Sequence, residues 1–124
     1  MNIYESAEDY LEAILIIRER KGVVHSVDIA EEKHYSKASV SVAMKRLREN
    51  GYIRMEKDGS IFLLEPGEEI AVRIYERHKV LKDYFMSIGV DEETAAKDAC
   101  KIEHDLSEIT FEKLKDDILR RTRS

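Results

Sequence analysis

Cysteine and proline are scarce in this sequence, and tryptophan is absent. The 124 residues include a single cysteine, Cys100, so no disulfide can form within the chain. One proline and five glycines exclude collagen-like and low-complexity chains. The longest apolar run, residues 13–17, is far shorter than the roughly 20 residues of a membrane span, and no basic, apolar leader precedes it. We therefore expect a cytoplasmic protein without a membrane partner.

What the sequence does contain favours helices. Charged residues make up 38% and apolar residues 43%, and the apolar share comes largely from alanine, leucine, isoleucine, valine and methionine. This composition predicts a mainly α protein. Its length suits one compact unit, or one domain with a short helical extension.

The net charge of −5 is unevenly distributed. Residues 33–57 hold seven basic and two acidic side chains, a surplus of five positive charges that leaves −10 for the rest of the chain. Basic clusters on one element are typical of phosphate-binding surfaces, although a solvated helix face is the plainer interpretation of a charge run. The neighbouring elements must decide between the two interpretations.

The first half of the chain has the pattern of a helix-turn-helix. Apolar spacing predicts a helix over residues 5–20 that ends at Gly22, and a shorter helix with Ser26 as its N-cap. After a break at residues 34–36, a third helix runs to Asn50-Gly51. Its buried stripe is predicted to be Val40, Ala43, Met44 and Leu47. The tight break between two helices indicates a helix-turn-helix.

A hairpin follows this motif. Residues 52–55 and 60–63 flank Lys57-Asp58-Gly59, and Asp-Gly predicts a two-residue β-turn with a basic tip. A helix-turn-helix followed by a hairpin is a winged helix. We therefore assign residues 1–65 to a winged helix-turn-helix domain with a small β-hairpin wing.

The second half is predicted to be entirely helical. Pro66 opens a long helix that ends at Gly89, Asp91 caps the next helix and Ser107 caps the last. The long helix has the apolar row Ala71, Ile74, Leu81, Phe85 and Ile88, and the last helix packs through Phe111, Leu114 and Ile118. We assign residues 66–124 to a second, helical domain.

The exposed side of the third helix suits double-stranded DNA. Its leading residues are slim, as entry into a major groove about 12 Å wide requires, and Ala38 or Val42 can contact a thymine methyl group. Basic residues further along and on the wing can bind phosphates. The predicted DNA-binding residues are Ser36, Lys37, Ala38, Ser39, Ser41, Val42, Lys45, Arg48, Arg54 and Lys57. Because the leading positions lack Arg, Asn and Gln, we expect readout through DNA shape and binding as a dimer.

A second cluster consists of residue types that bind metals. Cys100, Glu103 and His104 are spaced to share one helical face. His78 lies in the apolar row of the long helix, while Asp9 and Glu12 lie beside the apolar stripe of the first helix. Each alone has an ordinary interpretation, as a core histidine, a small buried thiol or a solvated face. Together near a core they would repel each other, at a cost of several kcal/mol per unpaired ion that a divalent cation removes.

Five short motifs resemble a known family. They are S-x-E-D-Y-L-E at residues 6–12, S-V-D-I-A at 26–30 with S-x-x-S-V-S at 36–41, R-H at 77–78, and A-C-x-I-E-H-x-L-S at 99–107. This pattern is similar to the iron- and manganese-dependent repressors of the diphtheria toxin repressor and manganese transport regulator family, over nearly the whole chain. The resemblance implies a homodimeric repressor of metal-homeostasis genes that binds operator DNA when Fe(II) or Mn(II) is bound. It also implies that the helical domain mediates dimerisation, and that the ligands are Asp9, Glu12, His78, Cys100, Glu103 and His104.

The chain departs from both branches of that family. Iron sensors with cysteine at position 100 usually have methionine at position 9, whereas manganese sensors combine Asp9 with glutamate at position 100. Positions 82 and 96, where the iron sensors have an ancillary site, hold Lys82 and Ala96, and the SH3-like domain of the longer members is expected to be missing. Because a thiolate favours Fe(II), Co(II), Ni(II) or Zn(II), we expect Fe(II) first, Mn(II) second and other divalent ions as surrogates.

Two other functions fit parts of the sequence. An enzyme could use Cys100 as nucleophile with His104 or His78 as base, but the surrounding acids keep a thiol protonated and no oxyanion-hole loop is evident, so we expect no enzyme. A winged-helix regulator that responds to a small organic ligand or a protein partner is the remaining alternative.

Overall fold

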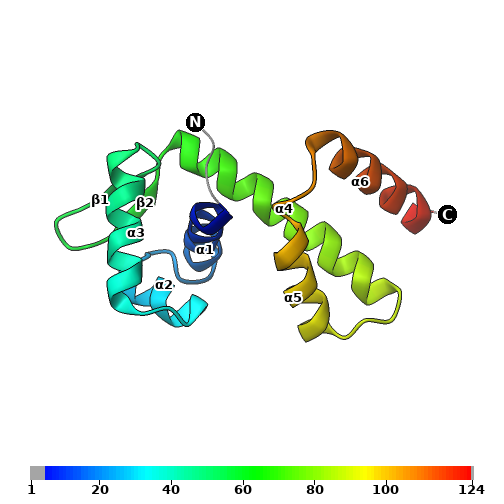
Figure 1. The fold of residues 1–124 in the computed structure, drawn as a ribbon, viewed down its shortest axis with the longest axis horizontal. Coiled ribbons are helices and arrows are strands. Elements are labelled where there is room, and N and C mark those ends of the chain that lie inside the picture. The colour runs from blue at the N-terminus through cyan, green and yellow to red at the C-terminus, as the bar shows by residue number, and fades with distance from the viewer. Residues whose placement is uncertain (1–4, 124) are drawn as a thin grey trace. The chain divides into compact units, whose positions relative to one another are not determined.

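The computed structural model describes residues 5–123, and Figure 1 shows their fold. Within that range it contains six helices and one hairpin. The elements are α1 (Glu5–Lys21), α2 (Ser26–Lys33), α3 (Lys37–Glu49), β1 (Ile53–Met55), β2 (Ile61–Leu63), α4 (Glu65–Ser87), α5 (Glu92–Ile102) and α6 (Glu108–Arg123). The chain forms two compact units, Met1–Arg73 and Ile74–Ser124, and α4 contributes to both. The predicted mainly α fold, with a winged helix-turn-helix first, is confirmed.

Helix α1 forms the centre of the first unit, with α2 and α3 packed against it (Figure 1). Its apolar residues recur three and four positions apart, so one broad face is buried. The core of this unit is formed by Leu11, Ile14, Ile17, Ile29, Val40, Met44, Ile53 and Ile61, all at most 3% exposed. Arg18 donates two hydrogen bonds, of 2.9 and 2.8 Å, to the Glu68 carboxylate and so fixes α1 to the first part of α4.

Helix α2 begins at Ser26, one residue earlier than predicted, and therefore has a different cap. The N-cap is His25 rather than Ser26. The Asp28 carboxylate reaches back and accepts a hydrogen bond of 2.9 Å from the His25 backbone N–H, as the third helical residue does in a capping box. The Lys21 ammonium lies 2.6 Å from the same carboxylate and lowers the pKa of Asp28.

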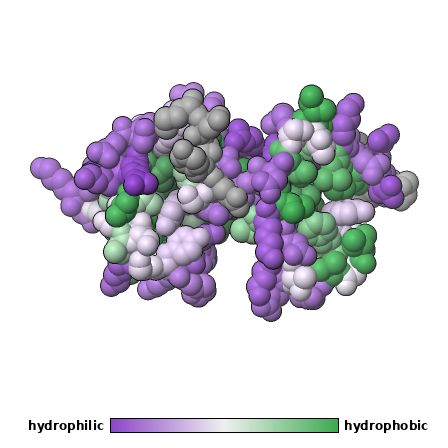
Figure 2. All heavy atoms as spheres, viewed as in Figure 1, coloured by the Kyte–Doolittle hydropathy of each residue, from purple (hydrophilic) through white to green (hydrophobic). Residues whose placement is uncertain are grey.

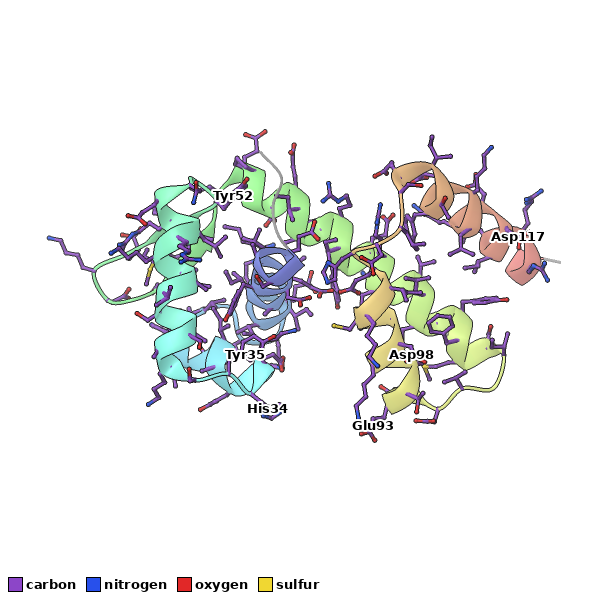
Figure 3. All side chains as sticks on the ribbon, viewed as in Figure 1. His34, Tyr35, Tyr52, Glu93, Asp98 and Asp117 are labelled. Atoms are coloured by element: carbon purple, nitrogen blue, oxygen red, sulfur yellow. The ribbon has the colours of Figure 1, made fainter. Side chains whose placement is uncertain are left out.

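The turn between α2 and α3 contains the only non-glycine residue with positive φ among residues 5–123. His34 has φ 59° and ψ 40°, the left-handed helical conformation, and Figure 3 labels it beside Tyr35. The Tyr35 backbone N–H donates to the Ala30 carbonyl, and the ring of Tyr35 lies 5.6 Å from that of Tyr10. The Ser36 hydroxyl then caps α3 by accepting from the Ser39 backbone N–H at 3.1 Å.

The wing is a hairpin, as predicted, but its turn is longer than predicted. Strands β1 and β2 are antiparallel with Arg54 opposite Phe62, and the Glu56 N–H donates to the Ser60 carbonyl. The loop is therefore residues 57–59, three residues rather than two. Asp58 accepts from both the N–H and the hydroxyl of Ser60, and Gly59 has φ 89°, which together close a three-residue loop.

Helix α4 starts against the backbone that precedes the wing. It begins at Glu65, one residue before the expected start at Pro66. Gly67 is buried beside the Tyr52 carbonyl, and a Cβ atom there would clash with that oxygen, which already accepts from the Leu64 N–H at 3.0 Å. Figure 3 labels Tyr52 near this junction.

The second unit is built from the rest of α4 with α5 and α6. Both predicted caps are confirmed, because Asp91 accepts from the Thr94 N–H at 3.0 Å and Ser107 accepts from the Thr110 N–H at 3.2 Å. The buried residues of this unit include Ile74, Leu81, Ala95, Ala99 and Phe111.

The buried row predicted for the long helix ends earlier than expected. Helix α4 stops at Ser87, and Ile88 follows it with 62% of its surface exposed, so its predicted place in the row is wrong. Apolar side chains are visible over α4 to α6 in Figure 2, and the exposed ones in this unit are Met86, Ile88, Ile102, Ile109 and Leu119. No helix within residues 5–123 is long and apolar enough to cross a membrane.

Replacing Gly67 by alanine should destabilise the protein by about 1–3 kcal/mol, because the added methyl group meets backbone rather than a flexible side chain. Urea unfolding followed by circular dichroism measures the change. The exposed Glu69 on the same helix provides the control, and Glu69→Ala should stay within about 0.5 kcal/mol of the parent. Equal losses for the two variants would contradict the close approach.

Replacing His34 by glycine should stabilise the protein by up to about 1 kcal/mol, because glycine adopts positive φ without steric strain. His25 has φ −124°, so His25→Gly should give no gain. Thermal unfolding of both variants tests this expectation, and a lower melting temperature for His34→Gly would refute it.

Candidate nucleic-acid interface and metal centre

Helix α3 presents a continuous exposed face opposite its buried stripe. Val40, Met44 and Leu47 are buried, while Ala43 is only half-buried, so the predicted stripe is narrower than expected. The predicted DNA-binding residues in and beside α3 are all exposed: Ser36, Lys37, Ala38, Ser39, Ser41, Val42, Lys45 and Arg48. Small side chains therefore lie at the N-terminal end of this face and basic side chains lie further along it, which suits a helix entering a groove.

Two of these serines already have partners. The Ser36 hydroxyl accepts from the Ser39 N–H and lies 2.9 Å from the Ser39 hydroxyl. Their first role is therefore to cap the helix, because an unsatisfied N–H at its start would be costly. Further along the same face, Val42 exposes 54% of its surface.

The wing adds cations next to this face. Arg54 on β1 and Lys57 at the tip are both exposed, as predicted. Arg48 at the end of α3 lies 4.0 Å from the Met55 sulfur, so the end of the helix and the wing are adjacent. Helix and wing together form one basic surface in the first unit.

In the second unit, the predicted metal ligands gather around one buried carboxylate. Glu103 is fully buried, its Oε2 lies 3.0 Å from His78 Nδ1, and its Oε1 lies 3.5 Å from His104 Nε2. Cys100 and Glu103 offer ligand atoms within 4.8 Å of each other. Helix α5 ends at Ile102, but Glu103 keeps right-handed helical dihedrals, and the predicted spacing holds up to that residue.

The donor set in this unit fits a divalent transition ion. A thiol, a carboxylate and two imidazoles are ligand types that such ions accept, with the thiol favouring softer metals. Lys82 forms an ion pair with Glu92 at 3.2 Å, so it offers no ligand at the position of the ancillary site.

A buried arginine, to which sequence reasoning gave no role, binds the backbone of the turn that contains Glu103. Arg77 donates hydrogen bonds to the carbonyls of Glu103 (3.0 Å) and Leu106 (2.6 Å). Its guanidinium also lies over the Phe111 ring, 5.1 Å from the centroid. The turn after α5 is thereby fastened to α4 next to His78. A charged residue between Ile74 and Leu81 in the apolar row was the signal that could have revealed it.

The two remaining predicted ligands belong to the first unit. Asp9 and Glu12 lie three positions apart on α1, Asp9 half-buried and Glu12 buried. The neighbouring Glu8 has a structural partner, because Arg73 lies 3.1 Å from its carboxylate. The six predicted ligands are thus divided between the units, two on α1 and four around the turn that follows α5.

Comparison with known proteins matches both halves of the chain. Residues 2–61 match the N-terminal DNA-binding domain of iron-dependent repressors, and residues 64–123 match their metal-binding and dimerisation domain. An uncharacterised HTH-type transcriptional regulator of Methanocaldococcus jannaschii is 37% identical over 113 residues, 90% of each chain. The HTH-type transcriptional regulator MntR of Bacillus subtilis is 35% identical over 111 residues, 90% of this chain and 78% of the relative.

Solved structures agree on the fold. The manganese regulator SloR matches with a TM-score of 0.80 and 24% identity, over 95% of this chain and 54% of that one. A manganese-dependent transcriptional repressor in complex with manganese matches with a TM-score of 0.81 and 23% identity, over 90% and 52%. This chain therefore spans about half the length of those structures.

These matches decide among the functions that the sequence left open. The domain matched by the second half is a metal-binding one, so a regulator that responds to a small organic ligand or a protein partner is not favoured. The relatives are regulators rather than enzymes. The chain belongs to the iron-dependent repressor family and is a metal-dependent, DNA-binding transcriptional regulator.

Proposed function

We propose that this protein is a homodimeric repressor of metal-homeostasis genes that binds operator DNA when Fe(II) is bound, with Mn(II) as the second candidate. The observation that carries the proposal is the buried Glu103 carboxylate between two imidazoles, with Cys100 beside it. Relatives named for manganese support the ion class, and a thiol in the donor set favours the softer Fe(II).

The proposed ligands are Asp9, Glu12, His78, Cys100, Glu103 and His104. When bound, a divalent cation would supply the positive charge that lets these carboxylates and the thiolate lie close together. Arg77 keeps Glu103 and His78 adjacent through its hydrogen bonds to the turn after α5, as groups behind metal ligands commonly do.

Helix α1 is the element that would couple metal binding to DNA binding. Its apolar face forms the core of the first unit together with α2 and α3, so an orientation imposed on Asp9 and Glu12 is imposed on the DNA-binding surface. With ligands from both units shared, the two recognition helices of a dimer would be held about one DNA turn, roughly 34 Å, apart.

We further propose that residues 1–65 bind DNA and residues 66–124 hold the metal and dimerise, with the exposed apolar residues of α4 to α6 supporting dimerisation.

The proposed DNA contacts follow the basic surface of the first unit. The hydroxyls of Ser36, Ser39 and Ser41 would contact base edges, and Ala38 or Val42 would contact a thymine methyl group. Basic side chains would bind phosphates, namely Lys37, Lys45 and Arg48 from the helix with Arg54 and Lys57 from the wing.

Chelation should weaken DNA binding by about 5- to 150-fold, the usual range for coupled sites. The measurement is fluorescence anisotropy of the full chain with a duplex selected from random sequence in the presence of Mn(II), with and without chelator. By reciprocity, DNA must tighten Mn(II) binding by the same factor in calorimetry.

Two variants control this experiment. Glu103→Gln should bind DNA weakly with or without metal, because it removes the central carboxylate. Glu112→Gln removes the same charge from the exposed surface of α6 and should behave like the parent. Equal affinity of the parent in both conditions would eliminate metal control.

Replacing Cys100 by glutamate should shift the metal preference toward Mn(II), because a carboxylate replaces the softer thiolate. Competition between Mn(II) and Co(II) in calorimetry measures the preference, and the thiolate absorption band of the Co(II)-loaded protein should disappear.

Lys101→Gln is the matched control for that variant, because it makes α5 more negative by one charge at an exposed position, as a carboxylate in place of a neutral Cys100 thiol does in the metal-free protein. The same Mn(II)-to-Co(II) ratio in the parent and in Cys100→Glu would argue against Cys100 as a ligand.

A further inference from the structure

The outward face of the wing contains an aromatic side chain that the core does not explain. The inward positions Ile53 and Ile61 are buried, whereas Phe62 leaves 41% of its surface exposed. Arg54 is directly opposite Phe62 in the strand register, and its guanidinium carbon lies 4.8 Å from the ring centroid. Phe62 therefore serves as a platform for a cation rather than as a core residue.

A carboxylate directly after β1 engages the same arginine. Residues two apart lie on the same side of a strand, and Glu56 Oε1 lies 3.0 Å from Arg54 Nε. The ring thus covers one face of the guanidinium and Glu56 occupies its Nε edge. Among residues 5–123, no partner is found for its Nη1 and Nη2 groups, and the side chain is 56% exposed.

We propose that Phe62 and Glu56 are positioning residues for Arg54, which they hold ready for one DNA backbone phosphate. Phe62 raises the affinity, because it restricts an otherwise flexible side chain before DNA arrives and leaves the two Nη groups available. Glu56 lowers the affinity, because its carboxylate neutralises part of the positive charge and repels the phosphate. The wing thereby holds Arg54 in position for a phosphate and also carries a carboxylate, Glu56, that weakens the binding of that phosphate.

The partner is DNA rather than an acidic protein. Arg54 is the strand neighbour of Met55, whose sulfur lies 4.0 Å from Arg48 at the end of α3, so the strand that carries Arg54 adjoins the DNA-binding helix. Phosphate contacts of this kind add to affinity for any duplex and increase its dependence on salt. They are therefore measurable without knowledge of the operator.

The test uses the full chain with saturating Mn(II) and a fluorescein-labelled random-sequence duplex of ~30 base pairs, titrated between about 50 and 200 mM salt. Phe62→Leu should weaken binding about two- to five-fold, the range of an exposed cation–π contact, and reduce the salt slope. Phe62→Tyr keeps the ring and should restore binding. In an Arg54→Gln background, Phe62→Leu should have no further effect.

Glu56→Gln should strengthen binding beyond a matched charge control. That control is Glu32→Gln, which removes a carboxylate 2.9 Å from Arg20, away from the wing and without an aromatic platform. Circular dichroism checks that all variants are folded.

Two outcomes would overturn the proposal. One is an equal loss from Phe62→Leu with and without Arg54, which would make the ring merely structural. The other is a gain from Glu56→Gln no larger than that from Glu32→Gln, which would leave only a change in net charge.

Discussion

The buried Glu103 carboxylate is the group around which the second unit is arranged. His78 lies 3.0 Å from one of its oxygens and His104 lies 3.5 Å from the other, while Arg77 holds the Glu103 carbonyl. A carboxylate placed in a fully buried position is expensive unless its charge is balanced. The arrangement therefore makes chemical sense as part of a cation site, in a chain whose first half is a DNA-binding domain.

In the first unit, the two faces of α3 have different roles. Val40, Met44 and Leu47 fix α3 to the core, which leaves the opposite face free for contact with DNA. The Ser36 hydroxyl caps α3, a role that the sequence analysis did not give it, and its contact with DNA stays a prediction. On the wing, the pairing of Arg54 with Phe62 shows how a two-stranded hairpin can orient a cation outside any core.

The order of elements was predictable because it depends on local patterns. Apolar spacing gave the helices, Asp91 and Ser107 gave two caps, and Asp58-Gly59 gave the hairpin. The wrong predictions, of the α2 cap and of the length of the wing loop, also have local causes. The N-cap of α2 is His25, whose backbone N–H donates to the Asp28 carboxylate within the helix. The loop of the wing is one residue longer than predicted because Asp58 accepts a hydrogen bond from Ser60.

The sequence by itself determined the mainly α fold, the basic segment and the residue types of the proposed metal site, since these follow from spacing and composition. Only the tertiary structure decided that His78 meets Glu103, that Arg77 fastens the turn between α5 and α6, and that Phe62 lies under Arg54. Such contacts join side chains from separate elements. They depend on how those elements pack, which no periodicity within one element specifies.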